Sequence, residues 1–231
     1  MRVLFGIGNP GAAYADTRHN IGFDALDRLA ADRGVAFRKA SSLRLEAEVE
    51  GKTVLVKPLT YVNRSGAALA EILNETKTTP LAGEVETTLP PGGVPAVDDD
   101  YREVVESVSQ RLLVVVDDVN LDLGRLRLKA KGSDGGHNGL KSLNAVMGTS
   151  SYPRLRIGVG ASAPGDLVEH VLGKFSPEEE EQRTAALDRA VEILSRYCEG
   201  ASLTELMTTC NRTPAASDAE ANGSSRSSDF E

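Results

Sequence analysis

The sequence predicts a single-domain α/β fold, in which a mixed, mostly parallel twisted sheet carries helices on both faces. The length of 231 residues fits one such domain. Short apolar runs alternate along the chain with segments in which apolar residues recur at helical spacing. One run, residues 112–116, is apolar at every position, which is typical of a strand buried on both faces.

The individual elements follow from periods of 2 and 3.6 residues. Before the buried run we expect a strand over residues 2–7, a helix carrying Phe23, Leu26 and Leu29, a hairpin of residues 46–49 and 53–57 around Gly51, and a helix over residues 65–73. After it we expect an alternating strand over residues 125–131, a strand over residues 155–159, a long helix with Leu187, Val191, Leu194 and Cys198 on one side, and a short helix with Leu203 and Leu206. The long helix should start at Ser176-Pro177-Glu178, because Ser suits the N-cap and Pro the first position.

The net charge of −8 is unevenly distributed. Residues 74–110 carry −6 and residues 215–231 carry −3, which leaves +1 for the rest of the chain. Residues 76–100 are rich in Thr, Pro and Gly without a clear period, and they predict an atypical acidic insertion. Residues 215–231 contain little to bury and predict a disordered tail. The folded domain is therefore expected within residues 1–212.

Composition argues against several classes of protein. No apolar run approaches the roughly 20 residues of a membrane helix, and the N-terminus does not resemble a signal peptide. Cys198 and Cys210 form neither a disulfide framework nor a metal-ligand spacing, and only three histidines are present. We therefore expect a reduced, cytoplasmic protein with no membrane contact and no metal site.

The first motif, Gly6-Ile7-Gly8-Asn9-Pro10-Gly11, matches the dinucleotide-binding pattern G-x-G-x-x-G after a first strand. It keeps an NAD(P)-binding Rossmann oxidoreductase open as an alternative. Pro10 argues against this alternative, because proline removes an N–H that a pyrophosphate would use. The stretch that should hold the ribose with an acid ends instead in Arg38-Lys39.

Two titratable residues are expected at the sheet edge where α/β proteins hold their ligands. His19 precedes the first helix, and we expect the helix N-terminus to keep its imidazole neutral and able to accept a proton. Asp117 follows the buried run, where a carboxylate can fix the histidine tautomer and stabilise the imidazolium. Each also has a structural interpretation, since His19 can cap the helix and Asp117 or Asp118 can cap a turn.

A glycine-rich segment and a basic strand complete the candidate chemistry. Residues 132–141 place glycines around His137-Asn138 before a helix, which suits close approach to an anionic ligand. The odd positions of residues 125–131 are all basic: Arg125, Arg127, Lys129 and Lys131. With Arg154 and Arg156 they predict a phosphate-binding stripe, and a solvated strand face is the alternative. Together the motifs predict water activation by a general base beside amide donors.

Four ordered blocks resemble the bacterial-type peptidyl-tRNA hydrolases. They are residues 6–11 with Tyr14 and residues 17–22, residues 57–66, residues 116–118, and residues 135–141, and weaker similarity continues through residues 154–158 and 171–175. The resemblance covers about residues 1–212 without the acidic insertion. It implies a phosphorylase/hydrolase-like α/β fold and a monomeric, cofactor-free esterase. Its substrate would be peptidyl-tRNA or N-blocked aminoacyl-tRNA dropped from ribosomes.

The resemblance also implies roles for matching positions. His19 matches the general base, Asp117 the acid that keeps it basic, and Asn9 the residue that distinguishes a peptidyl group from a free amine. The other matches bind substrate: Asn63 and Asn138 as amides, Tyr14 and Tyr61 near the tRNA 3′ end, and Lys129 and Arg156 at its phosphates. Family members commonly have Asp where Asn120 stands, and often Met where Val62 stands. A non-catalytic RNA-binding module remains a second alternative.

Overall fold

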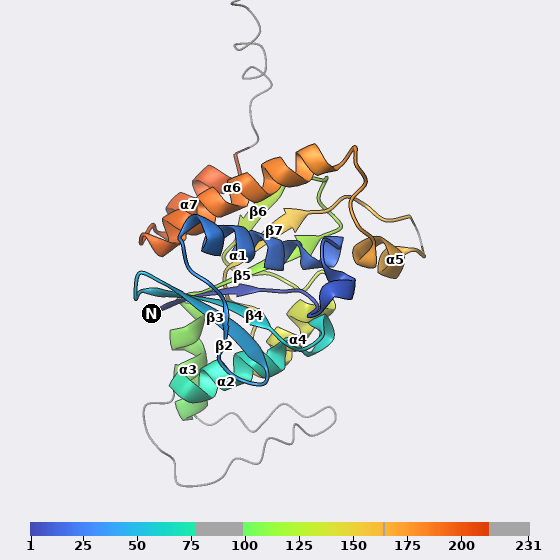
Figure 1. The fold of residues 1–231 in the computed structure, drawn as a ribbon. Coiled ribbons are helices and arrows are strands. Elements are labelled where there is room, and N and C mark those ends of the chain that lie inside the picture. Colours follow the sequence, from blue (N-terminus) through green and yellow to red (C-terminus); the bar gives the residue numbers. More distant parts are fainter. Residues whose placement is uncertain (77–98, 164, 213–231) are drawn as a thin grey trace, which may run out of the picture.

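The computed structural model describes residues 1–76, 99–163 and 165–212. The predicted disordered tail and most of the predicted acidic insertion lie outside this part of the chain. The described strands form a seven-stranded sheet in the order β2-β3-β4-β1-β5-β7-β6 (Figure 1). They are β1 (Arg2–Gly6), β2 (Arg38–Lys39), β3 (Arg44–Val49), β4 (Thr53–Pro58), β5 (Leu112–Asp118), β6 (Leu126–Lys129) and β7 (Arg154–Gly158).

The four central strands, β4, β1, β5 and β7, run parallel to one another. The hairpin partner β3 is antiparallel to β4, and the edge strand β6 is antiparallel to β7. The predicted mixed, mostly parallel sheet is therefore confirmed. In the register between β1 and β5, Gly6 pairs with Val115, so both strands end at the same edge of the sheet. This edge receives the segments that follow them.

Helices cover both faces of the sheet, as predicted (Figure 1). Those described are α1 (Ile21–Asp32), α2 (Gly66–Thr76), α3 (Asp99–Ser109), α4 (Asn138–Met147), α5 (Leu167–Leu172), α6 (Glu180–Cys198) and α7 (Leu203–Cys210). The described residues also form three 3₁₀ turns, which precede helices: η1 (Ala12–Tyr14) and η2 (Arg18–Asn20) before α1, and η3 (Val62–Arg64) before α2. Helices α1, α6 and α7 pack on one face, and α2, α3 and α4 on the other. None of the described helices is long and apolar enough to cross a membrane.

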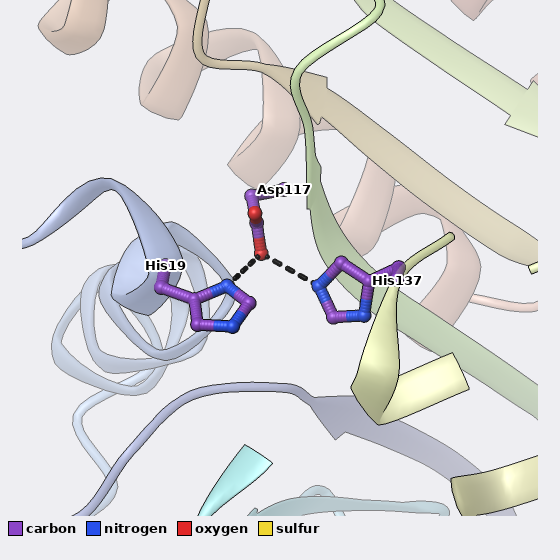
Figure 2. A group of neighbouring side chains, drawn as sticks. All are labelled: His19, Asp117 and His137. Atoms are coloured by element: carbon purple, nitrogen blue, oxygen red, sulfur yellow. Dashed lines mark hydrogen bonds and ion pairs between the residues drawn. The ribbon is translucent and has the colours of Figure 1, made fainter. Parts of the chain in front are cut away.

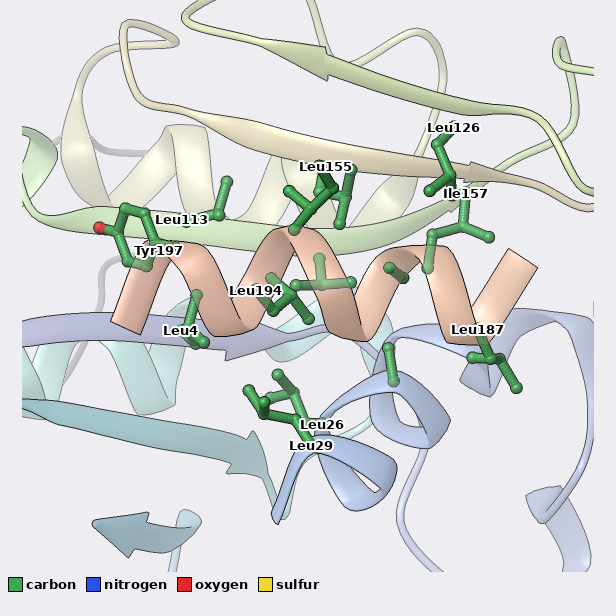
Figure 3. Close-up of a cluster of buried hydrophobic side chains, with 14 of the residues drawn as sticks. Leu4, Leu26, Leu29, Leu113, Leu126, Leu155, Ile157, Leu187, Leu194 and Tyr197 are labelled. Carbon is green, nitrogen blue, oxygen red and sulfur yellow. The ribbon is translucent and has the colours of Figure 1, made fainter. Parts of the chain in front are cut away.

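Strand β5 shows why the buried run needs apolar residues at every position. Leu113 and Val115 contact the cluster under α1 and α6, while Val114 and Val116 contact the cluster under α2 and α4. Figure 3 shows α6 lying across the sheet over the first of these clusters. Burial of one such side chain contributes about 1.5–3 kcal/mol. Because both faces are covered, the period-2 pattern of a half-exposed strand is absent from β5.

Four boundaries differ from those predicted. Helix α6 begins at Glu180 rather than at Ser176, and residues 177–179 form a turn before it. The Glu179 carboxylate accepts the Ser176 N–H at 2.7 Å, as in a capping box, so the start signal acts one turn ahead of the regular helix. The ends of the predicted insertion are helical, since α2 extends to Thr76 and α3 starts at Asp99. Ala130 lies beyond β6 and is exposed, so it does not share the buried face of Leu126 and Leu128.

Gly22 allows α1 to start against the edge of the sheet. A Cβ at this position would lie 2.6 Å from the carbonyl oxygens of both Ile7 and Val115. Real side chains do not approach that closely, so only glycine permits the first turn of α1 to contact the ends of β1 and β5. The preceding turn η2, which carries His19, is thereby held at the same edge as Asp117.

Candidate active site

Two histidines converge on the buried carboxylate of Asp117 (Figure 2). The His19 Nδ1 and the His137 Nε2 both lie 2.9 Å from Asp117 Oδ1. Asp117 is 2% exposed, and the side chains of the two histidines are 14% and 10% exposed. The three residues come from the end of β5, from η2 and from the loop before α4, so the site joins both faces of the sheet.

The hydrogen bonds fix the tautomer of each ring. An ionised carboxylate only accepts, so His19 Nδ1 and His137 Nε2 each carry a proton. The His137 Nδ1 accepts the backbone N–H groups of Gly139 and Leu140 at 3.1 and 3.3 Å and caps α4. His137 is therefore a neutral donor without a free lone pair. His19 keeps an unprotonated Nε2, which Figure 2 shows on the side of its ring away from Asp117.

Asp117 sets the basicity of His19. Burial by itself would lower the pKa of His19, but the charge of Asp117 and the hydrogen bond to it raise that pKa above its ordinary value. Burial likewise would raise the pKa of Asp117, but His137 and His19 hold it well below its ordinary value. The contacting carboxylate therefore acts on His19 in addition to the helix N-terminus, and it favours the protonated ring.

The same three side chains place ligand atoms within 4.8 Å of one another, as a metal site would. A metal ion would need a lone pair on the His137 Nε2. That nitrogen carries a proton instead, because the lone pair of the ring is on Nδ1, which accepts two backbone N–H groups. The chemistry of this donor set therefore suits a hydrogen-bonded base better than a metal centre.

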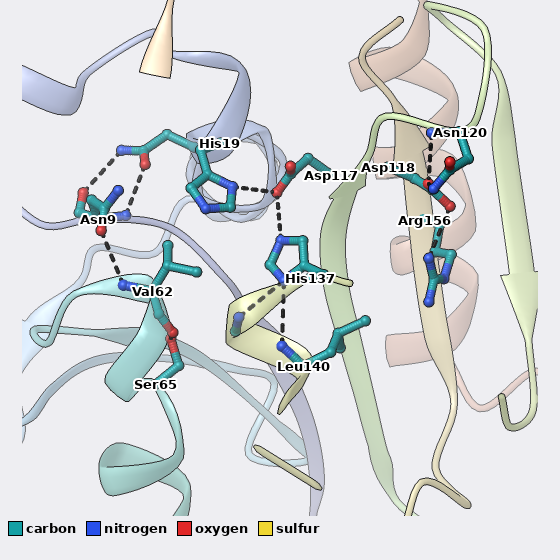
Figure 4. A network of polar contacts seen from close by, with 12 residues as sticks. Asn9, His19, Val62, Ser65, Asp117, Asp118, Asn120, His137, Leu140 and Arg156 are labelled. Carbon is teal, nitrogen blue, oxygen red and sulfur yellow. Dashed lines mark hydrogen bonds and ion pairs between the residues drawn. The ribbon is translucent and has the colours of Figure 1, made fainter. Parts of the chain in front are cut away.

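Asn9 lies three residues after the end of β1, and hydrogen bonds to two other residues hold it in place (Figure 4). Its Oδ1 accepts the backbone N–H of Val62 at 3.0 Å, which fixes the orientation of the amide. Its backbone N–H and C=O bind the side chain of Asn20 at 2.8 and 3.0 Å. Asn9 is 7% exposed, and its Nδ2 has no hydrogen-bond partner among the described residues. This N–H₂ group is available for a substrate carbonyl.

Replacing Asn20 by alanine should destabilise the protein by roughly 1–3 kcal/mol, because the buried N–H and C=O of Asn9 lose their partners. Urea denaturation measures the change. Asn74→Ala is a suitable control, since Asn74 is exposed on α2 and should change the free energy of unfolding by less than about 0.5 kcal/mol. Equal stability of both variants would show that Asn20 does not hold Asn9.

The neighbouring Asp118 belongs to a separate polar network. Its Oδ2 accepts from Arg156 at 2.9 Å, and its Oδ1 accepts from the backbone and side chain of Asn120 at 2.9 and 3.1 Å. Asn120 therefore donates hydrogen bonds to the Asp118 carboxylate. An aspartate at position 120 would place a second carboxylate beside it. The departure at Val62 leaves the bond to Asn9 in place, because Val62 makes that bond through its backbone N–H.

Comparison with known proteins identifies the family of this chain. The profile of the peptidyl-tRNA hydrolases matches residues 3–85 and 99–218. The chain belongs to the peptidyl-tRNA hydrolase family. It is 38% identical to the peptidyl-tRNA hydrolase of Halalkalibacterium halodurans over 91% of this chain and 100% of that protein. The corresponding protein of Aquifex aeolicus is also 38% identical, over 92% of this chain and 97% of its own length.

Solved structures agree with this family membership. A crystal structure of the peptidyl-tRNA hydrolase of Acinetobacter baumannii superposes with a TM-score of 0.72 at 26% identity and covers 91% of this chain and 94% of its own. The predicted family and the hydrolase class are confirmed. The Rossmann alternative is not supported, since residues 6–11 lead into η1 and the first α-helix begins only at Ile21. A dinucleotide site needs a helix N-terminus directly at the glycine turn.

Four of the predicted substrate-binding residues lie in or beside η1, η3 and the start of α4. Tyr14 and Tyr61 meet edge to face with ring centroids 6.0 Å apart, and Tyr61 is 56% exposed. Asn63 is exposed in η3, and Asn138 is exposed at the first position of α4, next to His137. Their contacts to substrate remain predictions.

The basic residues of the predicted stripe differ in exposure, and Arg127 is half-buried. Arg125, Lys129 and Lys131 are exposed on or beside β6, as predicted for phosphate contacts. Arg154 is fully buried and donates to the carbonyl oxygens of Gly132, Ser133 and Ser150, so its assignment to the phosphate stripe is wrong. Arg156 is 8% exposed and is already bound to Asp118 and to the Ser133 carbonyl.

Sequence reasoning missed two residues of the site. His137 was noted only as part of a glycine-rich segment, and Asn20 only as part of the motif around His19. A histidine at the N-cap position of a predicted helix could have indicated a hydrogen-bond donor in the site. When Nδ1 caps the helix, Nε2 carries the proton and points away from the helix. No local pattern indicates that it meets Asp117, 20 residues earlier in the chain.

Two cavities differ in their relation to this site. One of about 390 Å³ lies between η1, α1 and the hairpin β3–β4, and Asn9 and Asn20 line it. A larger one of about 700 Å³ lies between α3 and the end of α4, and none of the residues assigned to the site lines it. Volume therefore does not mark the candidate active site, whereas the converging polar groups do.

Proposed function

We propose that this protein hydrolyses the ester bond between peptide and tRNA in peptidyl-tRNA or N-blocked aminoacyl-tRNA. The observation that carries the proposal is the His19 imidazole, whose Nδ1 is held by Asp117 and whose Nε2 has no partner among the described residues. Family membership makes this ester the expected substrate. We also propose that the enzyme acts as a cytoplasmic monomer without a cofactor and recycles tRNA dropped from ribosomes.

In the proposed reaction, His19 Nε2 takes a proton from water while the water oxygen attacks the ester carbonyl. Asp117 stabilises the imidazolium that forms, and His137 keeps Asp117 in place by donating its Nε2–H. Amide N–H groups at the same edge stabilise the developing oxyanion. When the ester C–O bond breaks, the imidazolium returns its proton to the 3′ oxygen, which gives intact tRNA and the free peptide acid.

Recognition of the substrate is assigned to two sets of residues. The free Nδ2 of Asn9 donates to the carbonyl of the acylated amine, a group that aminoacyl-tRNA with a free amine lacks. Asn63 and Asn138 hold the acyl group, and Tyr14 and Tyr61 contact the tRNA 3′ end. Lys129, exposed at the end of β6, contacts phosphates of the tRNA.

The test is release of labelled N-acetyl-aminoacyl groups from tRNA by the purified protein, with the unacetylated aminoacyl-tRNA as the matched substrate. We expect cleavage of the acetylated ester and sparing of the free-amine ester. An intact acetylated ester, with tRNA bound, would contradict the proposal and favour the RNA-binding alternative. Equal cleavage of both esters would show that Asn9 does not select the acylated amine.

A further inference from the structure

The turn that carries the proposed base is held by the residues on either side of that base. Turn η2 contains Arg18, His19 and Asn20. A 3₁₀ turn has about three residues per turn, so consecutive side chains point about 120° apart. His19 meets Asp117 (Figure 4), and Asn20 binds the backbone of Asn9. Arg18 reaches a third part of the chain, the connection between α5 and α6.

The guanidinium of Arg18 binds this connection at two points. Its Nη1 donates to the Lys174 carbonyl at 2.6 Å, and its Nη2 donates to the Glu179 carboxylate at 2.6 Å. The group also lies over the Phe175 ring, 5.0 Å from the ring centroid. Because the Arg18 side chain is only 11% exposed, solvent screens its ion pair less than that of a surface arginine.

Backbone bonds bring η2 and the connection together at the same place. The Arg18 N–H donates to the Gly173 carbonyl at 3.0 Å, and the buried Thr17 forms an isolated antiparallel bridge with Lys174. A Cβ at Gly173 would lie 3.0 Å from the Glu169 carbonyl oxygen and 3.4 Å from Arg18 Nη1. Glycine at this position therefore allows the guanidinium to lie against the connection.

Glu179 extends the contact to a helix that is packed on the sheet. It is the N-cap residue of α6, which lies across the sheet (Figure 3). Its carboxylate also accepts the Ser176 N–H at 2.7 Å, so the acceptor of the Arg18 bond is itself held. The bond thus fixes η2 against a rigid element. Without it the His19 ring would shift, and a displacement of about 1 Å can lower the rate about 10²-fold.

We propose that Arg18 is a positioning residue that sets the direction of the His19 Nε2 through its bonds to the connection between α5 and α6. This inference rests on the proposed ester hydrolysis, because His19 is the base of that reaction. The role needs arginine rather than lysine. A planar guanidinium reaches a carbonyl and a carboxylate at once, whereas a lysine ammonium is a point charge on a flexible stem.

The first test is cleavage of N-acetyl-aminoacyl-tRNA by an Arg18→Lys variant. We expect kcat to fall about tenfold or more, while KM and the affinity for deacylated tRNA stay at the wild-type values, because a misplaced base affects only the transition state. Arg183→Lys is the matched control and should keep the wild-type kcat. The Arg183 guanidinium lies 5.2 Å from the centroid of the same Phe175 ring, but it pairs with carboxylates outside η2.

Two further measurements separate positioning from a general loss of structure. At a pH where the ring is neutral, the ¹⁵N NMR signals of His19 should report the Nδ1–H tautomer in the wild type and a mixture of tautomers in Arg18→Lys. In a His19→Ala background, Arg18→Lys should add little further loss, because both changes act on one group. If Arg18→Lys does not fold, Glu179→Gln removes the charged partner and gives the same comparison, with a loss of about threefold or more in kcat.

A wild-type kcat in Arg18→Lys, an unchanged His19 tautomer or full additivity with His19→Ala would overturn the proposal. A loss confined to KM or to tRNA affinity would make Arg18 a substrate contact instead. An equal loss in Arg183→Lys would assign both arginines to stability alone. If the wild type leaves the ester intact, the proposed function fails, and the NMR comparison still decides whether Arg18 positions His19.

Discussion

A His19→Ala variant is expected to hydrolyse N-acetyl-aminoacyl-tRNA with a kcat about 10²–10⁴-fold below that of the wild type, because removal of a general base typically has this effect. No other described group replaces it directly, since the lone pair of His137 is occupied by the N–H groups of Gly139 and Leu140. Single-turnover cleavage of labelled substrate measures the loss. The residual rate should rise with pH as hydroxide replaces activated water.

The third histidine provides the matched control. His170 lies in α5 and its Nε2 contacts the Gly160 carbonyl at 3.0 Å, outside the Asp117 cluster. His170→Ala should therefore keep the wild-type rate, while both variants keep their affinity for tRNA. A folded His19→Ala variant with the full rate would require a different base and would refute the mechanism proposed for this site.

An Asp117→Asn variant should lose about 10²–10⁴-fold in kcat/KM, because the imidazolium formed during the reaction loses its counter-charge. The loss should appear on full-length tRNA and on a short CCA ester alike, since Asp117 is buried and contacts only protein groups. Stopped assays with acetylated substrate measure it. A loss restricted to KM would instead assign Asp117 to substrate binding.

The pH profile of kcat/KM shows in which direction Asp117 shifts the pKa of His19. His19 works as a base only when neutral, so the rate falls as pH drops through its folded-state pKa. Asp117 raises that pKa, so the acid limb of the wild type lies above the ordinary histidine value. In Asp117→Asn, burial still lowers the pKa of His19 and the opposing charge is gone, so the limb moves to lower pH.

Asp24→Asn tests whether this shift is specific to Asp117. Asp24 lies five residues after His19 and is paired with Arg183 at 2.7 Å, outside the histidine cluster. Its substitution should leave the acid limb where the wild type has it. An unshifted limb in Asp117→Asn, or an equal shift in both variants, would mean that Asp117 does not set the basicity of His19.

The fold was predictable because its signals are local. The apolar residues 112–116 indicate a strand covered on both faces, and the spacing of Leu187, Leu194 and Cys198 indicates the long helix α6. Boundaries were less predictable: the Ser176-Pro177-Glu178 start signal is followed by a turn of residues 177–179, and α6 begins only at Glu180. Short elements such as β2 and α5 have too few residues to show a period.

By itself the sequence determined the fold class, the family and the placement of His19 and Asp117 at one sheet edge. Periodicity is a property of neighbouring residues, and parallel strands bring their carboxyl ends together. Only the tertiary structure decided that His137 shares the Asp117 carboxylate with His19, and that Arg154 is buried. These outcomes depend on where the loop of residues 132–137 returns across the sheet. That path is set by long-range hydrogen bonds to β7, which no local pattern records.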